Sequence, residues 1–176
     1  MKTISAVLLS TLLLLLSGCA SVTSDIKTDA EVDPTVKLSG YKSYAWLGDA
    51  GVLNDPEGKW QPPKMNISEN IKSLIDREMQ KHGYYLYAEN PDLAVMFFMG
   101  VDMENMRLKT DPNTQQDILK KVPAAGLVVA LVDVKTEYVV WVGAATGELQ
   151  KNPSDETIRK RLDYAVTQMF KKLPKD

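Results

Sequence analysis

The sequence has little that could support metal or redox chemistry, because its 176 residues include one cysteine and one histidine. A lone cysteine cannot close a disulfide within the chain, and a lone histidine excludes metal sites that need two imidazoles. We interpret His82 as a structural residue at a helix end, where the helix dipole favours a partly cationic ring. Methionine thioethers can bind Cu(I), but Met96 and Met99 fall in an apolar segment where core packing explains them. The sequence therefore predicts no metal site and no cofactor.

Basic charge is also scarce. The chain has 21 lysines and arginines against 23 aspartates and glutamates, a net charge of −2 at pH 7. Without a basic excess to neutralise phosphates, nucleic acid is not an expected partner. Basic residues do gather at 159–161 and 171–172. They indicate the solvated face of a helix, with contact to anionic lipid head groups as the alternative.

A catalytic constellation is missing as well. The close carboxylate pairs, Asp102 with Glu104 and Asp155 with Glu156, lie in no recognisable motif. The glycines of residues 143–147 lack the spacing and the following lysine of a phosphate-binding loop. We therefore expect that the protein is not an enzyme, and an envelope hydrolase ranks third among the functional hypotheses.

No apolar run is long enough to cross a membrane, since the longest, residues 6–16, has about half of the roughly 20 residues required. This run follows the basic Lys2 and ends at Leu16, Ser17, Gly18 and Cys19, the layout of a signal peptide that closes in a lipobox. Small residues at 17 and 18 fit a narrow protease cleft, and the Cys19 thiol is the group that takes the diacylglycerol. We predict cleavage after residue 18 and acylation of Cys19, palmitate included, which anchors the protein in a membrane by three acyl chains.

The residue after the cysteine bears on the destination. Ala20 stands where an aspartate commonly retains lipoproteins in the inner membrane, so we expect the outer membrane, with the domain facing the periplasm. Residues 19–38 are polar and acidic and indicate a tether, in which residues 22–26 could pair as an edge strand. Residues 39–176 remain as the periplasmic domain. About 160 mature residues suit one domain.

Two amphipathic helices can be read from the sequence. Asn66 and Glu69 have the spacing of a capping box, and apolar residues then recur on one face as far as His82, before the stop at Gly83. A second helix begins near Ser154. A further short helix is expected within residues 115–121, in the least readable part of the chain, residues 102–123.

Strands are predicted at residues 41–47, 93–101, 126–134 and 138–145, with the last two forming a hairpin. Residues 93–101 and 126–134 are apolar on both faces, which indicates buried strands. The fold class expected is α+β, a single two-layer domain. Its sheet is mixed and mostly antiparallel, has about five strands, and carries two main helices packed on it.

Several stretches of the sequence also occur, in this order, in one known family. They are Asp33 and Pro34, residues 38–47, residues 82–84, residues 89–93, residues 127–133, Lys135 and Thr136, and residues 140–143. Together they cover nearly the whole mature chain, which resembles a family of envelope lipoproteins catalogued only as a domain of unknown function. The resemblance implies a small mixed α/β domain and brings no activity or catalytic residue with it. Members usually have glycine where this chain has Glu137, and often a basic residue where it has Val142.

The leading hypothesis is an outer-membrane lipoprotein, without enzymatic activity, whose domain binds or supports another envelope component. The alternative is a carrier of a small apolar ligand, with a pocket between sheet and helices lined by four aromatic side chains. These are Trp46, Tyr84, Phe97 and Trp141. A flat exposed apolar patch favours a protein partner, whereas a closed apolar cavity favours the ligand.

Overall fold

The structure is a computed structural model that describes residues 22–47, 52–54, 65–100, 107–110, 117–120, 126–148, 150 and 152–174. The predicted signal peptide and the lipobox residues Leu16, Ser17 and Gly18 lie outside these residues. The predicted acylation site, Cys19, lies outside them as well. The domain itself can be described from Val22 onward.

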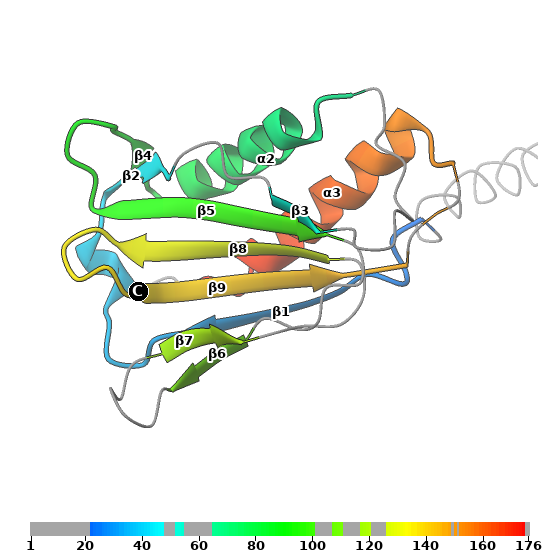
Figure 1. Cartoon of the computed structure of the whole chain (residues 1–176). Coiled ribbons are helices and arrows are strands. Elements are labelled where there is room, and N and C mark those ends of the chain that lie inside the picture. Colours follow the sequence, from blue (N-terminus) through cyan, green and yellow to red (C-terminus); the bar gives the residue numbers. More distant parts are fainter. Residues whose placement is uncertain are drawn as a thin grey trace, which may run out of the picture.

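A sheet of seven strands dominates the described part of the chain (Figure 1). The described residues form nine strands, seven of them in this sheet: β1 Lys27–Val32, β2 Ser43–Trp46, β3 Val52–Asn54, β4 Tyr85–Leu86, β5 Leu93–Gly100, β6 Arg107–Thr110, β7 Asp117–Lys120, β8 Gly126–Asp133 and β9 Val139–Thr146. Six of them follow the order β1-β9-β8-β5-β2-β4, and β3 pairs with β5 beyond the end of β2. The remaining two, β6 and β7, form a separate antiparallel pair.

The sheet is antiparallel on one side and parallel on the other. The pairs β1–β9, β9–β8 and β8–β5 are antiparallel, while β5–β2, β5–β3 and β2–β4 are parallel. The eight residues of β5 pair along their whole length with β8, and β5 lies in the interior of the sheet, between β8 and β2. The predicted mixed α+β sheet is confirmed, with more strands than the expected five.

Two helices, α2 Ile67–Lys81 and α3 Asp155–Phe170, lie on the same face of the sheet (Figure 1). Asn66 caps α2 by accepting a hydrogen bond from the backbone N–H of Glu69, and Ser154 caps α3 in the same way. Their buried apolar side chains fall on the apolar faces read from the sequence. They are Ile67, Ile71, Ile75, Met79, Ala165, Val166, Met169 and Phe170.

An ion-pair cluster joins the two helices on their outer side. Arg77 of α2 donates to Glu78 at 2.6 Å, and also to Asp163 and Thr167 of α3. Glu78 is 4% exposed and also accepts from Lys81 at 2.9 Å. Burial alone would raise the pKa of the Glu78 carboxyl, but the hydrogen bonds from Lys81 and Arg77 keep it below its usual value. The guanidinium of Arg77 is thus committed to holding α2 against α3.

The core between helices and sheet closes around Trp141. The indole is fully buried, and its centroid lies 5.2 Å from that of Phe170. It also lies across the backbone of Gly143, where a Cβ atom would fall well inside contact distance of the ring. Position 143 therefore requires glycine.

The tether predicted for residues 19–38 needs correction. The edge strand lies at Lys27–Val32 and not at residues 22–26, and the 3₁₀ turn Leu38–Gly40 follows it with Leu38 in the core. Arg161 of α3, one of the basic residues interpreted as solvated, is 13% exposed and donates to both carboxylate oxygens of Asp25 at 2.7 Å. It also donates to the carbonyl of Val22. The described domain therefore includes residues from Val22 onward, well before residue 39.

One further prediction differs from the structure, whereas the predicted hairpin of the last two strands is confirmed. Residues 117–120 form strand β7 and not a helix, because they pair with β6 over four positions. The β8–β9 turn forms without glycine, and Glu137 takes the left-handed backbone conformation there, with φ of 61°. This conformation is strained for any residue with a Cβ atom, which gives a physical reason for the glycine usual in the resembling family.

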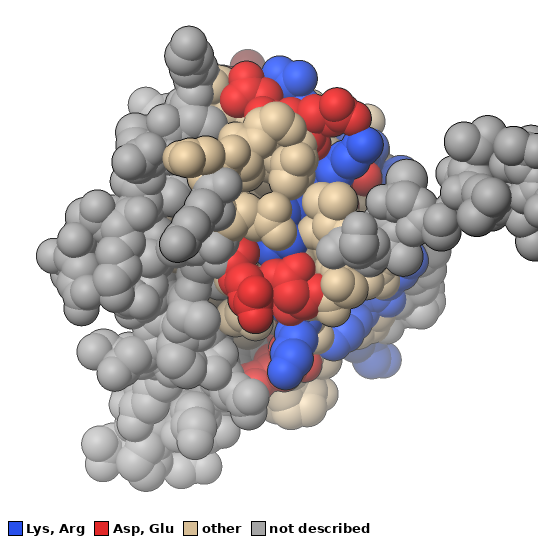
Figure 2. Space-filling model, turned by 90° about the vertical axis from the view of Figure 1, so that its right-hand side faces the viewer, with Lys and Arg blue, Asp and Glu red and all other residues tan. Residues whose placement is uncertain are grey.

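Acidic and basic side chains lie next to one another at the end of the molecule where the chain enters the domain (Figure 2). The Asp25–Arg161 pair lies in this region, and Glu156 pairs with Lys160 at 2.7 Å on the first turns of α3. On the described surface, this end of the molecule therefore has no patch of purely positive or purely negative charge.

Candidate binding groove

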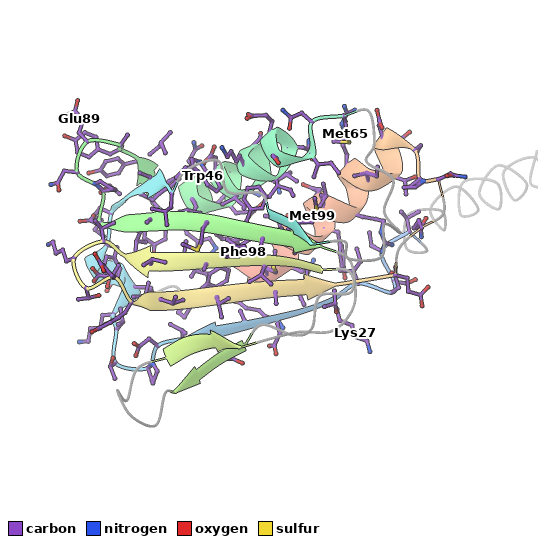
Figure 3. The ribbon with its side chains drawn as sticks, viewed as in Figure 1. Lys27, Trp46, Met65, Glu89, Phe98 and Met99 are labelled. Atoms are coloured by element: carbon purple, nitrogen blue, oxygen red, sulfur yellow. The ribbon has the colours of Figure 1, made fainter. Side chains whose placement is uncertain are left out.

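A groove of about 530 Å³ lies between α2 and the sheet edge formed by β2 and β4. The sheet side contributes Trp46 and Leu86, and the exposed side of α2 contributes mostly polar residues. They are Glu69, Lys72, Ser73, Asp76, Arg77 and Gln80. We call this site the α2–β4 groove. Figure 3 shows Trp46 between β2 and α2, at the edge of the sheet opposite to Lys27.

Trp46 is held rigidly in the wall of the groove. Its Nε1 donates to Asp76 Oδ1 at 3.1 Å, and its ring meets Phe97 edge to face at 6.1 Å. The Lys72 ammonium lies 5.7 Å from the ring centroid, within the range of a cation–π contact. Asp76 Oδ1 also accepts from the Tyr44 hydroxyl at 2.7 Å. Burial, together with this hydrogen bond, raises the pKa of Tyr44, so the hydroxyl stays a donor at all physiological pH values.

The far wall of the groove is the short edge strand β4. Its N–H groups at Tyr85 and Tyr87 donate to carbonyls of β2 at 3.0 and 2.8 Å. The side chains point outward, with Tyr85, Leu86 and Tyr87 exposed by 56%, 54% and 42%. Because successive side chains of a strand point to opposite faces, Leu86 lines the groove, whereas Tyr85 and Tyr87 are exposed on the other side of the edge.

The carboxylate of Asp92 fixes the strand that supports this edge. It accepts from the backbone N–H groups of Lys42 and Ser43 at 2.9 and 3.0 Å and from the Ser43 hydroxyl. The two backbone hydrogen bonds lower the pKa of Asp92. Tyr41 donates to Asp133 at 2.7 Å in the neighbouring turn. Tyr41, Asp92 and Asp133 belong to the stretches that resemble the family, and their hydrogen bonds hold this end of the domain together.

A second cavity, of about 270 Å³, lies at the C-terminal end of α2. Lys42, Lys81 and His82 contribute to its lining. Its basic character does not make it an anion site, because Lys81 pairs with Glu78 and the helix C-terminus repels anions. His82 packs its ring 6.2 Å from Phe170, consistent with its interpretation as a structural residue.

The four aromatic residues predicted to line a ligand pocket do not share one cavity in the described structure. Phe97 and Trp141 are fully buried and Tyr84 is 6% exposed, so these three are packed against other core side chains. Trp46 lines the α2–β4 groove, where most of the lining residues are polar, and Tyr84 lines the separate cavity at the C-terminal end of α2. The apolar-ligand hypothesis therefore loses the site on which it depended.

The other sequence candidates fall into structural positions. Met96 and Met99 lie on opposite faces of β5, and Met99 packs against the core. Asp155 and Glu156 form the first turn of α3, while the second carboxylate pair lies outside the described residues. Among the described residues there is no cluster of three or more histidine, cysteine or carboxylate groups arranged for a metal. None of the helices described has the length and apolar character needed to span a membrane.

Sequence reasoning missed the residues that make the groove, above all Lys72, Asp76 and Leu86. On a sequence, Lys72 and Asp76 belong to the polar face of a helix, which usually contacts only water. Their approach to Trp46 depends on tertiary packing. The sequence does offer one signal, the run of three large side chains at residues 85–87. Such a run breaks the alternation of apolar and polar residues expected of a strand with one face in water.

Comparison with known proteins supports the fold. Residues 28–175 match the family described as "Domain of unknown function (DUF4136)". No functionally curated protein matches the chain. A DUF4136 family protein from Bacteroides thetaiotaomicron has a similar structure, with a TM-score of 0.61 at 14% identity over 85% of this chain and 96% of that one.

Two further solved structures are less similar. A PelC variant from Paraburkholderia phytofirmans, described as a dodecamer, has a TM-score of 0.43 at 14% identity over 82% of this chain and 96% of that one. A minor lipoprotein from Acinetobacter baumannii has a TM-score of 0.33 at 12% identity, over 76% and 93% of the two chains. At these scores neither likeness supports an argument about this protein.

Proposed function

Because the chain belongs to the DUF4136 family, which it matches over residues 28–175, we propose that it is a lipid-anchored protein of the cell envelope. Residues 1–18 are removed and Cys19 is acylated. The lipobox residues Leu16, Ser17 and Gly18 support this proposal. Ala20 supports the outer membrane as the destination, with the domain in the periplasm.

Labelling with radioactive or clickable palmitate tests the anchor. The wild type is expected to take up label, whereas Cys19→Ser stays unlabelled and keeps residues 1–18. Ser17→Ala preserves a small residue in the lipobox and serves as the control that is still processed. Ala20→Asp is expected to move the labelled protein to the inner membrane fraction. Membrane attachment and processing of Cys19→Ser would contradict the proposal.

The domain, we propose, has no enzymatic activity and binds another envelope component at the α2–β4 groove. The observation that carries this proposal is the exposure of Tyr85, Leu86 and Tyr87 beside a groove whose walls are fixed by hydrogen bonds. Exposed apolar residues that cluster on a rigid edge are typical of interaction surfaces. The polar lining of the groove favours a macromolecular partner over a small apolar ligand.

Site-specific photocrosslinking in intact cells tests this surface. A photoreactive amino acid replaces Leu86 in one strain and Asp29, on the opposite edge, in the control strain. We expect a discrete adduct from position 86 and none from position 29. The absence of a reproducible adduct at 86, or the same adduct from both positions, would argue against binding at the groove.

A further inference from the structure

We infer that the α2–β4 groove takes an extended peptide segment of the partner, which adds to the sheet as a strand beside β4 and places a basic side chain at Asp76. This inference rests on the proposed binding function and specifies its chemistry. It follows from the backbone at the sheet edge, from the length of the groove and from its charges.

The backbone of β4 has a position that faces away from the sheet. In a parallel pair, successive residues direct their N–H and C=O groups alternately to the two sides. Tyr85 and Tyr87 direct their N–H groups to β2, at the carbonyls of Lys42 and Tyr44. Leu86, between them, therefore presents its N–H and C=O groups outward.

A second outward position lies on β2. That strand pairs with β4 only at its first two residues and extends two residues further. Leu47 donates its N–H to Val95 of β5, so the preceding residue, Trp46, directs its backbone groups to the other side, past the end of β4. Edge positions of this kind pair readily with an extended chain, and two of them border one groove.

The length of the groove suits a short segment. The helix residues that line it extend from Glu69 to Gln80, which at 1.5 Å per residue is about 16 Å. A strand rises about 3.3 Å per residue, so the groove accommodates roughly five residues of extended chain. Alternate side chains of that segment face the groove, where Trp46 and Leu86 offer apolar contact to a central one.

The charges of the groove favour a basic segment. The positive charge of Arg77 is already paired with Glu78 and Asp163. The remaining charges that line the groove are then two carboxylates, Glu69 and Asp76, and one ammonium group, Lys72. Asp76 uses Oδ1 for Tyr44 and Trp46, and its second oxygen has no hydrogen-bond partner in the described structure. That oxygen is the acceptor available to a lysine or arginine of the partner. The same acidic balance disfavours a second copy of this chain, since pairing two such edges brings like charges together.

Binding of a labelled peptide to the detergent-purified lipoprotein tests the inference. The probe is a fluorescein-labelled peptide of about five residues, with lysine at both ends and β-branched apolar residues between, the length following from the strand rise. Two matched peptides accompany it: one with the backbone N-methylated at alternate positions, and one with glutamate in place of lysine. Fluorescence anisotropy is expected to show binding of the first peptide, with at least tenfold weaker binding of either variant.

Substitutions at the β4 edge distinguish the contribution of the backbone to peptide binding from that of the side chains. Leu86→Pro removes the outward N–H without touching the bonds from Tyr85 and Tyr87, whereas Leu86→Ala keeps that N–H and loses the side chain. We expect a loss of at least tenfold in affinity for the proline variant and about threefold for the alanine variant, because a strand-edge proline is tolerated structurally. Asp76→Asn keeps the hydrogen-bond geometry and is expected to abolish the preference for lysine over glutamate.

The outcomes distinguish this inference from the proposed function. A crosslinked partner at position 86 together with no peptide binding, or binding insensitive to N-methylation, overturns strand addition and leaves the binding function intact. Failure of the crosslink as well as of the peptide removes both. Self-association in analytical ultracentrifugation that Leu86→Pro abolishes would assign the edge to a second copy and overturn the peptide proposal.

Discussion

The two edges of the main sheet offer very different surfaces to another chain. The β1 edge carries Lys27, Asp29 and Glu31 along its six residues. The ammonium of Lys172, on the segment after α3, donates to the carbonyl of Thr28 and so occupies an acceptor of this strand. Charges on an edge strand and covered backbone groups are the usual means by which proteins prevent edge-to-edge association.

The β4 edge lacks both protections. Tyr85, Leu86 and Tyr87 carry no charge and are exposed, and the adjoining groove leaves backbone positions accessible. This contrast between the two edges is what the proposed binding at the β4 edge requires. Four substitutions test how independent the two edges are, beginning with the largest expected effect.

Gly143→Ala should damage the β1 edge most. Gly143 pairs with Ala30 of β1, and a methyl group there collides with the buried indole of Trp141. We expect a loss of about 2–3 kcal/mol in the free energy of unfolding, the range for overpacked cores, measured by urea denaturation. Gly40→Ala, where nothing lies within 4 Å of the added Cβ, is the control and should stay within about 0.5 kcal/mol. Equal stability of the two variants would contradict this packing.

Arg161→Ala should release the N-terminal end of the β1 edge. It leaves Asp25 without its partly buried partner, and we expect a loss of about 2 kcal/mol. Hydrogen exchange should accelerate at residues 22–32, with no change at residues 85–87. Exposed Arg159→Ala is the matched control, expected to change stability by less than about 0.5 kcal/mol.

The same pair gives a pH dependence. The hydrogen bond from Arg161 lowers the pKa of Asp25 to about 2, below its ordinary value of 3.8. A depressed folded-state pKa contributes stability that is present above 3.8 and is lost as the pH falls toward 2. The stability difference between wild type and Arg161→Ala should therefore shrink over this window. A difference that stays constant from pH 5 to 2 would be incompatible with the pair.

Asp92→Ala should loosen the β4 edge and spare the other. The substitution removes the acceptor for the N–H groups of Lys42 and Ser43, and we expect a loss of about 1–2 kcal/mol. Hydrogen exchange at residues 42–46 and 85–87 should rise while β1 keeps its protection. Asn90→Ala, on the same exposed turn, is the control expected to leave exchange unchanged. Uniform acceleration across the sheet would show that the edges are coupled.

Glu137→Gly should have the smallest effect and should stabilise the protein. It relieves the left-handed backbone conformation at the β8–β9 turn, and the gain is about 0.5 kcal/mol after the entropy of glycine in the unfolded chain is subtracted. Both edges should keep their exchange rates. Glu137→Ala retains the Cβ atom and is expected to bring no gain in thermal stability, so an equal gain from alanine would rule out backbone strain as the cause.

The sequence predicts the elements whose pattern is local. Asn66 and Ser154 mark the beginnings of both helices, and the two-sided apolar residues of β5 and β8 identify the buried strands. Strand β1 gives no strand signal in the sequence and resembles a tether, because its core-facing residues, Thr28, Ala30 and Val32, are too small or polar to stand out between charged neighbours. Their partner strand β9 lies more than 100 residues away, and no local signal reports such pairing.

The candidate site was the harder part for the same reason. Phe97 and Trp141 were pocket candidates because they are aromatic. In the structure they are buried in the core, where large apolar side chains contribute most to stability. The groove depends on a polar helix face that meets Trp46 across the tertiary structure. Residues of ordinary type become a site only when the fold brings them together.

If Cys19 is acylated as proposed, its short distance along the chain from Val22 limits how far the groove can stand from the membrane. Arg161 binds the carbonyl of Val22, three residues after Cys19, and three residues of chain reach about 10 Å at most. With Cys19 acylated, the end of the sheet near Lys27 rests close to the bilayer. Strands β5 and β8 rise from there, since their Gly100 and Gly126 ends lie beside the start of β1.

The β4 edge lies at the other end of these eight-residue strands, roughly 25 Å further out by the strand rise. Under the proposed anchor, a partner on the same membrane would meet the groove with a segment that projects this far from the bilayer. Lengthening the link after Cys19 by a flexible insert would raise the groove and should weaken capture of such a partner in cells, while peptide binding in solution stays the same.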